Sequence, residues 1–327
     1  EDARSISAPG VAVNAMNRFQ HLDQLYYSVF QPFESSYWNG NLKRYQVVDG
    51  EIHGQNGYAV DPATGYFRTG SQSMWSSMID GPDVTKGGAR EQVGTRKLLY
   101  TTSAGGALQQ INWGSTSVPS NAQLGLAANA TAAQRTALLN ELKTMWGDPL
   151  HSVPVMVNYG EDAENNYVFV STNGGMLHAI DTEDGSEAFA FMPHEILQKA
   201  NLYTTSRPPL RVNNTRQTYG LDGSWVAWRK GGANAMDEPE FVYLYGGMRR
   251  GGRNYYALDV TDPTDPEMLW QVNNSSEDLA GLGQTWSTPT LTSVPDGSGS
   301  EVPIIVVGGG YSPNDHDNYS ALSTGDE

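Results

Sequence analysis

The chain of 327 residues carries a formal net charge of −16 and contains 36 glycines, 17 tyrosines and 8 tryptophans but no cysteine. An acidic chain is a poor partner for nucleic acid, whose phosphates attract basic faces, and for electrostatic attachment to an anionic membrane. The lack of cysteine excludes disulfides, thiolate catalysis and zinc–cysteine sites, and no apolar run approaches the roughly 18 residues of a membrane-spanning segment.

The first 38 residues are expected to form a lead-in segment, because the first copy of a repeated pattern begins at residue 39. Residues 39–327 are expected to form one β-domain. The chain opens with EDARSISAPG, without an initiator methionine or a signal peptide. This opening predicts either a mature product or a piece cut from a longer chain.

A glycine pair followed by an apolar strand recurs along the chain. The copies are NGNLKRYQV (39–47), GGALQQIN (105–112), GGMLHAID (174–181) and GGRNYYALD (251–259), which place Leu42, Leu108, Leu177 and Tyr255 at equivalent positions. Runs rich in β-branched and aromatic residues precede three of the copies. The pattern predicts an all-β fold, a β-propeller of four-stranded antiparallel blades. The copies lie 66, 69 and 78 residues apart, more than the roughly 40–50 residues of a usual blade, so inserted loops are expected.

One short helix is expected among the strands, in the segment TAAQRTALLNELKTMWG (131–147). Thr131 and Gln134 have the spacing of a capping box at its start. Leu138, Leu142 and Met145 line one face, which predicts a surface helix packed through that stripe.

His178 lies within the third copy, where it alternates with Leu177 and Ala179 along a predicted strand. The residues at its position in two other copies are Gln109 and Tyr256. A catalytic histidine has no reason to recur as glutamine and tyrosine. His178 is therefore predicted to be a structural residue that packs or hydrogen-bonds between blades.

Three loops carry enough oxygen ligands to be considered for Ca²⁺, which takes six to eight oxygens from carboxylates and carbonyls. They are Asp181, Asp184 and Glu187; Asp262, Asp265 and Glu267; and Asn314, Asp315 and Asp317. Turn chemistry alone explains the first two loops, because Asp and Gly are common in tight turns. The metal-site prediction is therefore the third loop, with Asn314, Asp315 and Asp317 as calcium ligands.

Several ordered segments resemble the PilC/PilY family, whose members are associated with the tip of bacterial type IV pili. They are NGNLKRYQV (39–47), AVDPATGYF (59–67), DGPDVTKGGA (80–89), GDPLHSVPVMVNYG (147–160), VFVSTNGGMLHAIDTEDGSEAFAFMPHEIL (168–197), LDGSW (221–225) and LYGGMRRGGRNYYALDVTDP (244–263). The likeness covers most of the chain. It implies a propeller of the seven-bladed type that forms the C-terminal half of a larger exported protein. The chain is accordingly expected to be incomplete at its C-terminus, after STGDE.

The resemblance also implies a function. Members of the family act in pilus biogenesis, where they counter retraction, and in surface adhesion and twitching motility. The implied partners are minor pilins, the pilus tip and a receptor on a host or abiotic surface. The implied location is the pilus tip, the outer-membrane surface or the periplasm of a Gram-negative bacterium. Several members bind calcium through a D-x-D-x-D-G loop, a run that this chain lacks, so calcium is the only cofactor considered.

The alternative is an enzyme of the quinoprotein dehydrogenase class, whose blades carry the pattern A-x-D-x-x-T-G-x-x-x-W. Ala179 and Asp181 match that pattern, but Ser186 does not. The vicinal disulfide of many such enzymes is impossible without cysteine. Hydrolase and phosphate-binding motifs are also missing. The arginines of GGMRRGG (246–252) are expected to meet solvent, a carboxylate or a partner. A protein without enzymatic activity is therefore predicted.

Overall fold

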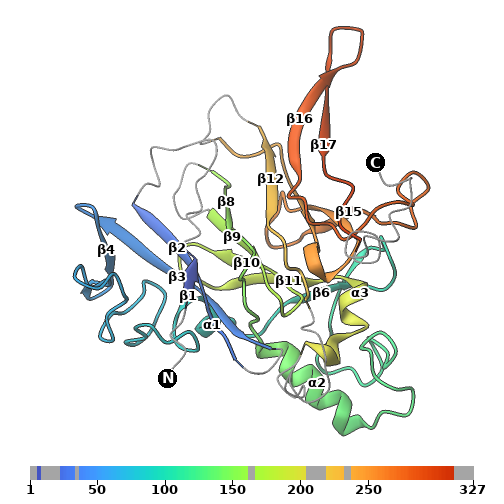
Figure 1. Cartoon of the computed structure of the whole chain (residues 1–327). Coiled ribbons are helices and arrows are strands. Elements are labelled where there is room, and N and C mark those ends of the chain that lie inside the picture. Colours follow the sequence, from blue (N-terminus) through green and yellow to red (C-terminus); the bar gives the residue numbers. More distant parts are fainter. Residues whose placement is uncertain are drawn as a thin grey trace, which may run out of the picture.

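The computed structural model describes residues 6–8, 23–33, 37–160, 166–203, 219–231 and 237–312. Within these residues the strands form four separate sheets, and helices are few and short (Figure 1). The prediction of an all-β fold with four-stranded antiparallel blades is confirmed.

The first sheet has the strand order β1-β2-β3-β4-β5. Its strands are β1 (Ile6–Ala8), β2 (Gln24–Gln31), β3 (Asn39–Val48), β4 (Glu51–Gly54) and β5 (Gly57–Tyr58). Strand β2 belongs to the expected lead-in segment, and it pairs with β3 along its whole length. Leu42 and Tyr45 on β3 are fully buried, and the short helix α1 (Gly88–Glu91) packs against this strand.

The second sheet contains a four-stranded antiparallel blade and two added strands, in the order β7-β6-β11-β10-β9-β8. The blade consists of β8 (Val155–Asn158), β9 (Asn166–Ser171), β10 (Leu177–Asp181) and β11 (Glu187–Met192). Strand β6 (Leu98–Thr101) pairs with β11 in parallel, and β7 (Leu108–Gln110) pairs with β6 in antiparallel orientation.

This arrangement corrects one part of the predicted repeat. Leu108 was expected on the same kind of strand as Leu177, in a blade of its own, but it begins the edge strand β7 of the sheet that contains Leu177. An isolated hairpin of two short strands is only marginally stable, whereas every residue of β6 is buried once it pairs with β11. The hairpin therefore extends an existing blade, and the residues that follow it form a long loop and a helix.

The third sheet is an antiparallel meander of β12 (Trp225–Lys230), β13 (Phe241–Gly247), β14 (Tyr255–Asp259) and β15 (Glu267–Val272). Leu177 and Tyr255 both begin the third strand of a four-stranded blade, so their predicted equivalence is confirmed. A register shift follows Ala179 in one blade and Ala257 in the other. The fourth sheet is the hairpin β16 (Thr290–Pro295) and β17 (Glu301–Val306).

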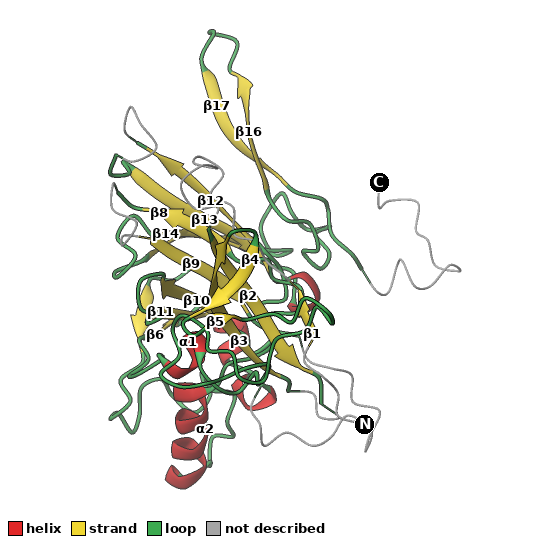
Figure 2. Ribbon diagram, turned by 90° about the vertical axis from the view of Figure 1, so that its left-hand side faces the viewer, coloured by secondary structure: helices red, strands yellow, loops and turns green. Residues whose placement is uncertain are grey.

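The predicted helix is present as α2 (Ala132–Thr144), and both hydrogen bonds of the capping box between Thr131 and Gln134 are formed. Leu138, Leu142 and Met145 are buried, as the stripe predicted. Figures 1 and 2 show α2 at one end of the molecule and the β16–β17 hairpin projecting from the other. The remaining short helices are α3 (His194–Leu197), η1 (Ala200–Leu202) and η2 (Arg249–Gly251). Within the described ranges, no helix has the length and apolar character needed to cross a membrane.

His178 is fully buried and stacks on Trp146, with ring centroids 4.1 Å apart and planes 11° from parallel. Its Nδ1 lies 3.4 Å from the carboxylate of Glu187, which also forms a buried ion pair of 2.9 Å with Arg96. Burial lowers the pKa of His178, so the ring is neutral. Tyr256 holds the equivalent position in the third sheet and lies nearly parallel to Trp225, but with ring centroids 6.4 Å apart. The packing and hydrogen bonding predicted for His178 are confirmed, although its partner Glu187 lies on β11 of the same sheet and not on another blade.

Candidate functional site

The loops that precede the first strands of three successive sheets meet the turns of neighbouring strands. Asp148, Asp222 and Thr285 lie at corresponding places, just before β8, β12 and β16. Asp148 accepts a hydrogen bond of 3.0 Å from the Asn173 side chain, in the turn between β9 and β10. Thr285 accepts one of 2.8 Å from the backbone N–H of Met248, in the turn between β13 and β14. The Asp148 bond lies within the second sheet, whereas the Thr285 bond fastens the segment before β16 to the third sheet.

A group of mainly cationic and aromatic side chains gathers at this junction. We call it the arginine cluster, and it consists of His151, Tyr219, Asp222, Arg249, Arg250 and Trp286. The carboxylate of Asp222 is completely buried and is its anionic centre. It lies 2.7 Å from Nδ1 of His151 and 3.0 Å from Nη1 of Arg249. The side chains of both partners remain partly exposed, at 24% and 22%.

The two arginines extend the cluster across an indole ring. The guanidinium carbons of Arg249 and Arg250 lie 4.4 Å and 5.1 Å from the centre of the Trp286 ring, within cation–π range. Arg250 also lies over the ring of Tyr219 and donates a hydrogen bond of 2.8 Å to its hydroxyl. Trp286 keeps 37% of its surface exposed. The cluster thus presents positive charge and an aromatic surface on a strongly acidic chain.

The backbone at Arg249 adopts a left-handed conformation with φ of 50°. Asp49 is the only other non-glycine residue with positive φ in the described part of the chain. This conformation costs an L-residue roughly 1–2 kcal/mol, and tertiary contacts must hold it. Two contacts are present, because Arg249 donates its N–H to the carbonyl of Thr285 at 3.1 Å and its side chain binds Asp222. In this conformation the guanidinium of Arg249 lies between the carboxylate of Asp222 and the indole ring of Trp286.

The arrangement lacks the parts of a hydrolytic site. His151 and Asp222 form a pair that would orient a catalytic imidazole, and Ser224 lies nearby. The hydroxyl of Ser224, however, donates to the backbone carbonyl of His151 and accepts from the N–H of Val153. Within the described ranges, no hydroxyl is hydrogen-bonded to the ring of His151. The cluster offers charged groups and an exposed aromatic ring.

Asp148 has a different environment from Asp222, although the two hold corresponding positions. Burial raises the pKa of Asp148 to about 6, and the nearby negative charge of Asp222 acts in the same direction. The hydrogen bonds from Asn173 and from the N–H of Leu150 offset this only in part. Among the described residues Asp148 forms no ion pair, whereas Asp222 forms one with Arg249.

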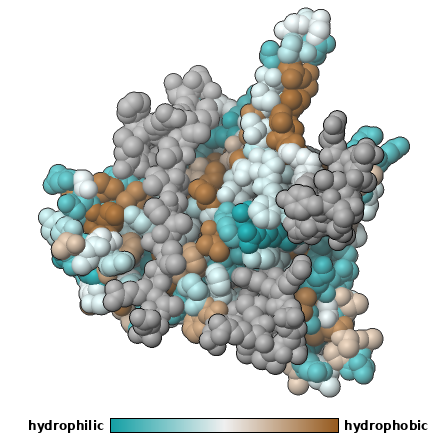
Figure 3. All heavy atoms as spheres, viewed as in Figure 1, coloured by the Kyte–Doolittle hydropathy of each residue, from teal (hydrophilic) through white to brown (hydrophobic). Residues whose placement is uncertain are grey.

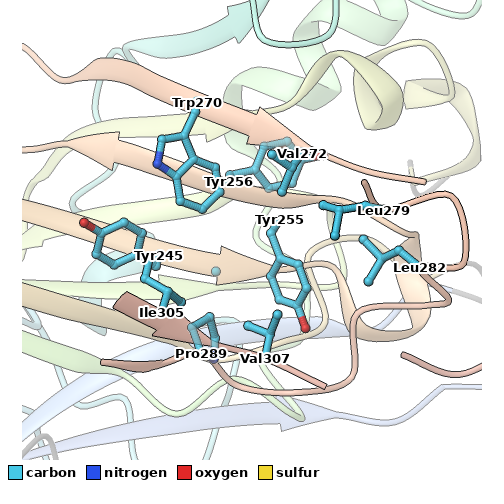
Figure 4. Close-up of a pocket in the computed structure, with 11 residues that line it drawn as sticks. Tyr245, Tyr255, Tyr256, Trp270, Val272, Leu279, Leu282, Pro289, Ile305 and Val307 are labelled. Carbon is cyan, nitrogen blue, oxygen red and sulfur yellow. The ribbon is translucent and has the colours of Figure 1, made fainter. Parts of the chain in front are cut away.

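An apolar cavity of about 250 Å³ lies between the third sheet and the segment that carries β16 and β17 (Figure 4). Its lining is aromatic and aliphatic and consists of Tyr245, Gly246, Tyr255, Tyr256, Trp270, Val272, Leu279, Leu282, Pro289, Ile305 and Val307. Beyond it, Figure 3 shows an apolar strip along the projecting hairpin, where Val294, Val302 and Val306 are exposed. This region suits contact with apolar groups.

The predicted calcium ligands Asn314, Asp315 and Asp317 lie outside the described residues. In the loop at 181–187, Asp181 and Asp184 accept hydrogen bonds of 2.8 Å from the N–H groups of Glu183 and Ser186, as turn chemistry predicts. Glu187 forms a buried ion pair with Arg96. Where the chain is described, no group of three or more histidine or acidic residues has the spacing of a metal site.

Sequence reasoning found the parts of the arginine cluster without connecting them. The arginines of the segment 246–252 were expected to meet solvent, a carboxylate or a partner, and Arg249 indeed binds Asp222. The pairing of His151 with Asp222, and the position of Trp286, were missed. The available signal was the similar placement of GDPLHS (147–152), LDGSW (221–225) and QTWS (284–287) ahead of successive first strands.

Residues 148–326 match the family model described as the PilY1 beta-propeller domain. The chain is 28% identical over 316 residues to the type IV pilus biogenesis factor PilY1 of Pseudomonas aeruginosa PAO1, an alignment that covers 84% of this chain and 24% of that protein. It is 35% identical over 142 residues to a PilY1 homolog of Xylella fastidiosa, covering 41% of this chain and 10% of the homolog. The chain thus spans about a quarter of the length of the first of these relatives.

A solved structure, the crystal structure of the Pseudomonas aeruginosa PilY1 C-terminal domain, is 26% identical to this chain. It aligns with a TM-score of 0.33 over 49% of this chain and 32% of that one.

Proposed function

This chain belongs to the family of the PilY1 beta-propeller domain, and on that premise we propose that it acts as a non-enzymatic factor of type IV pilus assembly. The observation that carries the proposal is the match of the family model to residues 148–326. The proposed roles are pilus biogenesis, adhesion to surfaces and twitching motility. The proposed location is the pilus tip, the outer-membrane surface or the periplasm.

The arginine cluster and the apolar cavity are the proposed contact surfaces. Minor pilins and other components of the pilus tip would meet them, as would a receptor on a host or abiotic surface. A partner with exposed carboxylates and aromatic side chains would match the positive charge and the indole of Trp286. Aromatic residues and arginine are the residue types most enriched where binding energy concentrates. The cavity beside β16 and β17 offers an apolar recess for an anchoring side chain.

The hydrogen bonds of Ser224 and His151, the pair that most resembles a catalytic site, support the proposal that the chain is not an enzyme. The hydroxyl of Ser224 is bonded to backbone groups and not to the ring of His151. The competing assignment, a quinone-dependent dehydrogenase, is tested directly. The purified chain, given pyrroloquinoline quinone, calcium and an alcohol or aldose, is expected not to reduce an artificial electron acceptor above background. Reproducible turnover that depends on the quinone would establish the enzyme.

Calcium binding at Asn314, Asp315 and Asp317 remains a proposal. Two carboxylates and one amide resemble the weak extracellular class of site, with a dissociation constant around 10⁻⁴–10⁻³ M.

The function is tested in the bacterium that encodes the chain. An in-frame deletion of the gene is expected to abolish surface pili and twitching, and the wild-type gene is expected to restore both. Replacing Arg249 and Arg250 by alanine should restore protein level but not full piliation. The matched control removes an exposed cation elsewhere, Lys86→Ala, whose side chain is 60% exposed, and should behave as wild type. A deletion strain with normal pili would contradict the proposal.

A further inference from the structure

A second cavity lies between α2 and the loop that precedes it. Its volume is about 250 Å³, and its walls come from residues 113–121 and from the first three turns of the helix. Figure 1 shows α2 at the end of the molecule opposite the β16–β17 hairpin. Nothing in the proposed pilus function accounts for this cavity.

The cavity contains a buried cation without a counter-ion. Arg135 on α2 lines the wall and is only 5% exposed. Its Nη1 donates a hydrogen bond of 3.3 Å to the side-chain oxygen of Asn121, a neutral group. Its Nε and Nη2 have almost no accessible surface and therefore lie behind the cavity wall. In the part of the chain that the structure describes they have no hydrogen-bond partner, and Arg135 forms no ion pair. A buried charge normally has an ionic partner, because burial without one is costly.

The other walls strengthen the positive field and add polar groups. Lys143 lies at the same cavity, with its ammonium 5.4 Å from the centre of the Trp113 ring. No aspartate or glutamate lines the space. Ser115 and Thr136 supply hydroxyls, Asn121 supplies an amide, and Trp113 supplies an apolar surface. The lining therefore combines positive charge, donors and acceptors for hydroxyl groups, and one indole.

We infer that this cavity binds an acidic sugar, a single ring that carries a carboxylate, with the carboxylate neutralising Arg135. A carboxylate is the natural partner of a guanidinium, because the two form charge-assisted hydrogen bonds. The hydroxyls of the sugar match the polar wall, and its apolar C–H face matches Trp113. A hexuronate has the required combination of charge and hydroxyl groups. The inference rests on the cavity and not on the pilus function.

Isothermal titration calorimetry of the purified chain with sodium D-glucuronate tests the inference. D-glucose has a similar ring without the carboxylate, and sodium acetate has the carboxylate without the ring, so each is expected to bind at least about tenfold more weakly. Sodium phosphate at equal ionic strength distinguishes a sugar acid from any anion. Glucuronate should bind at submillimolar to millimolar concentration.

Two variants connect the binding to Arg135. Asn121→Asp preserves shape and places a carboxylate on the guanidinium, so it should raise the melting temperature and weaken glucuronate binding at least about tenfold. Arg135→Gln removes the buried charge and should weaken binding similarly. Lys86→Gln, which removes an exposed charge outside the cavity, should leave binding unchanged.

The outcomes are decisive in both directions. Binding of glucuronate that Asn121→Asp weakens and Lys86→Gln does not would establish the site, even if Arg135→Gln failed to fold. Three results would overturn it: no binding of glucuronate at 10 mM, equally tight binding of glucose or phosphate, or binding that survives Asn121→Asp unchanged.

Discussion

Replacing Asp148 by asparagine is expected to stabilise the protein at neutral pH, although it removes a buried hydrogen-bonded side chain. The carboxylate lies in the loop before β8, where burial raises its pKa from the ordinary 3.8 to about 6. At 1.36 kcal/mol per pKa unit, keeping this group ionised in the folded state costs about 3 kcal/mol. Asparagine has the same shape, and its oxygen accepts the same bonds from Asn173 and Leu150.

The pH dependence gives the sign of the effect. Below pH 3.8 the carboxyl group is protonated in both states, so it carries no penalty. Between pH 3.8 and about 6 the unfolded chain ionises while the folded chain stays protonated, so stability falls as pH rises. Above pH 6 the full penalty is present. Asp148→Asn should therefore gain up to about 3 kcal/mol at pH 8 and nothing at pH 3.5.

Urea denaturation of both proteins between pH 3.5 and 8 measures the difference. Asp222→Asn is the matched control, because Asp222 holds the corresponding position but is bound to His151 and Arg249. Removing its charge leaves the guanidinium of Arg249 without its buried anion, and at pH 7 it should destabilise by roughly 1–3 kcal/mol. A destabilised Asp148→Asn at pH 8, or a difference independent of pH, would refute the reasoning.

Three further outcomes are expected. Leu177→Ala should lower the free energy of unfolding by about 2–5 kcal/mol because Leu177 is completely buried. Leu269→Ala, at a residue that is 40% exposed, should lower it by less than about 1 kcal/mol. Equal losses in denaturation experiments would mean that β10 is not part of the core. Arg249→Gly should be about 1 kcal/mol more stable than Arg249→Ala, since only glycine tolerates the left-handed backbone there, and thermal melts of the pair would show it. Calcium at 1 mM should stabilise by only roughly 0.4–1.4 kcal/mol, and the small thermal shift should vanish in Asp315→Ala/Asp317→Ala; a shift of ten degrees or more that survives would place the metal site elsewhere.

The repeating parts of the fold were readable from sequence because each depends on neighbouring residues. The glycine pair, the strand that starts at Leu177 or Tyr255 and the capping box at Thr131 all act over a few positions. The same reading went wrong at Leu108, whose local pattern matches the others. The place of Leu108 is decided by the free edge of β11 (Glu187–Met192), which comes much later in the chain. No local pattern contains that information.

The candidate sites were less readable for the same reason. His151, Asp222 and Trp286 come from three loops, and only the stacking of successive sheets brings them together. Arg135 lies outside the apolar stripe of Leu138, Leu142 and Met145, so the sequence pattern did not predict its burial. Its burial follows from the loop folded over α2, whose sequence of small and polar residues gives no sign of a defined structure.

The parallel pairing of β6 with β11 sets an order of events in folding. Leu98 can pair only after Ala190, its partner across the sheet, is in place. Closing so long a loop costs conformational entropy before the contacts between the two strands can offset it. During synthesis the β6–β7 hairpin emerges well ahead of that partner, with Leu98 and Tyr100 still accessible to water or to other chains. Any dissection of the protein between residues 111 and 186 would separate two halves of one sheet.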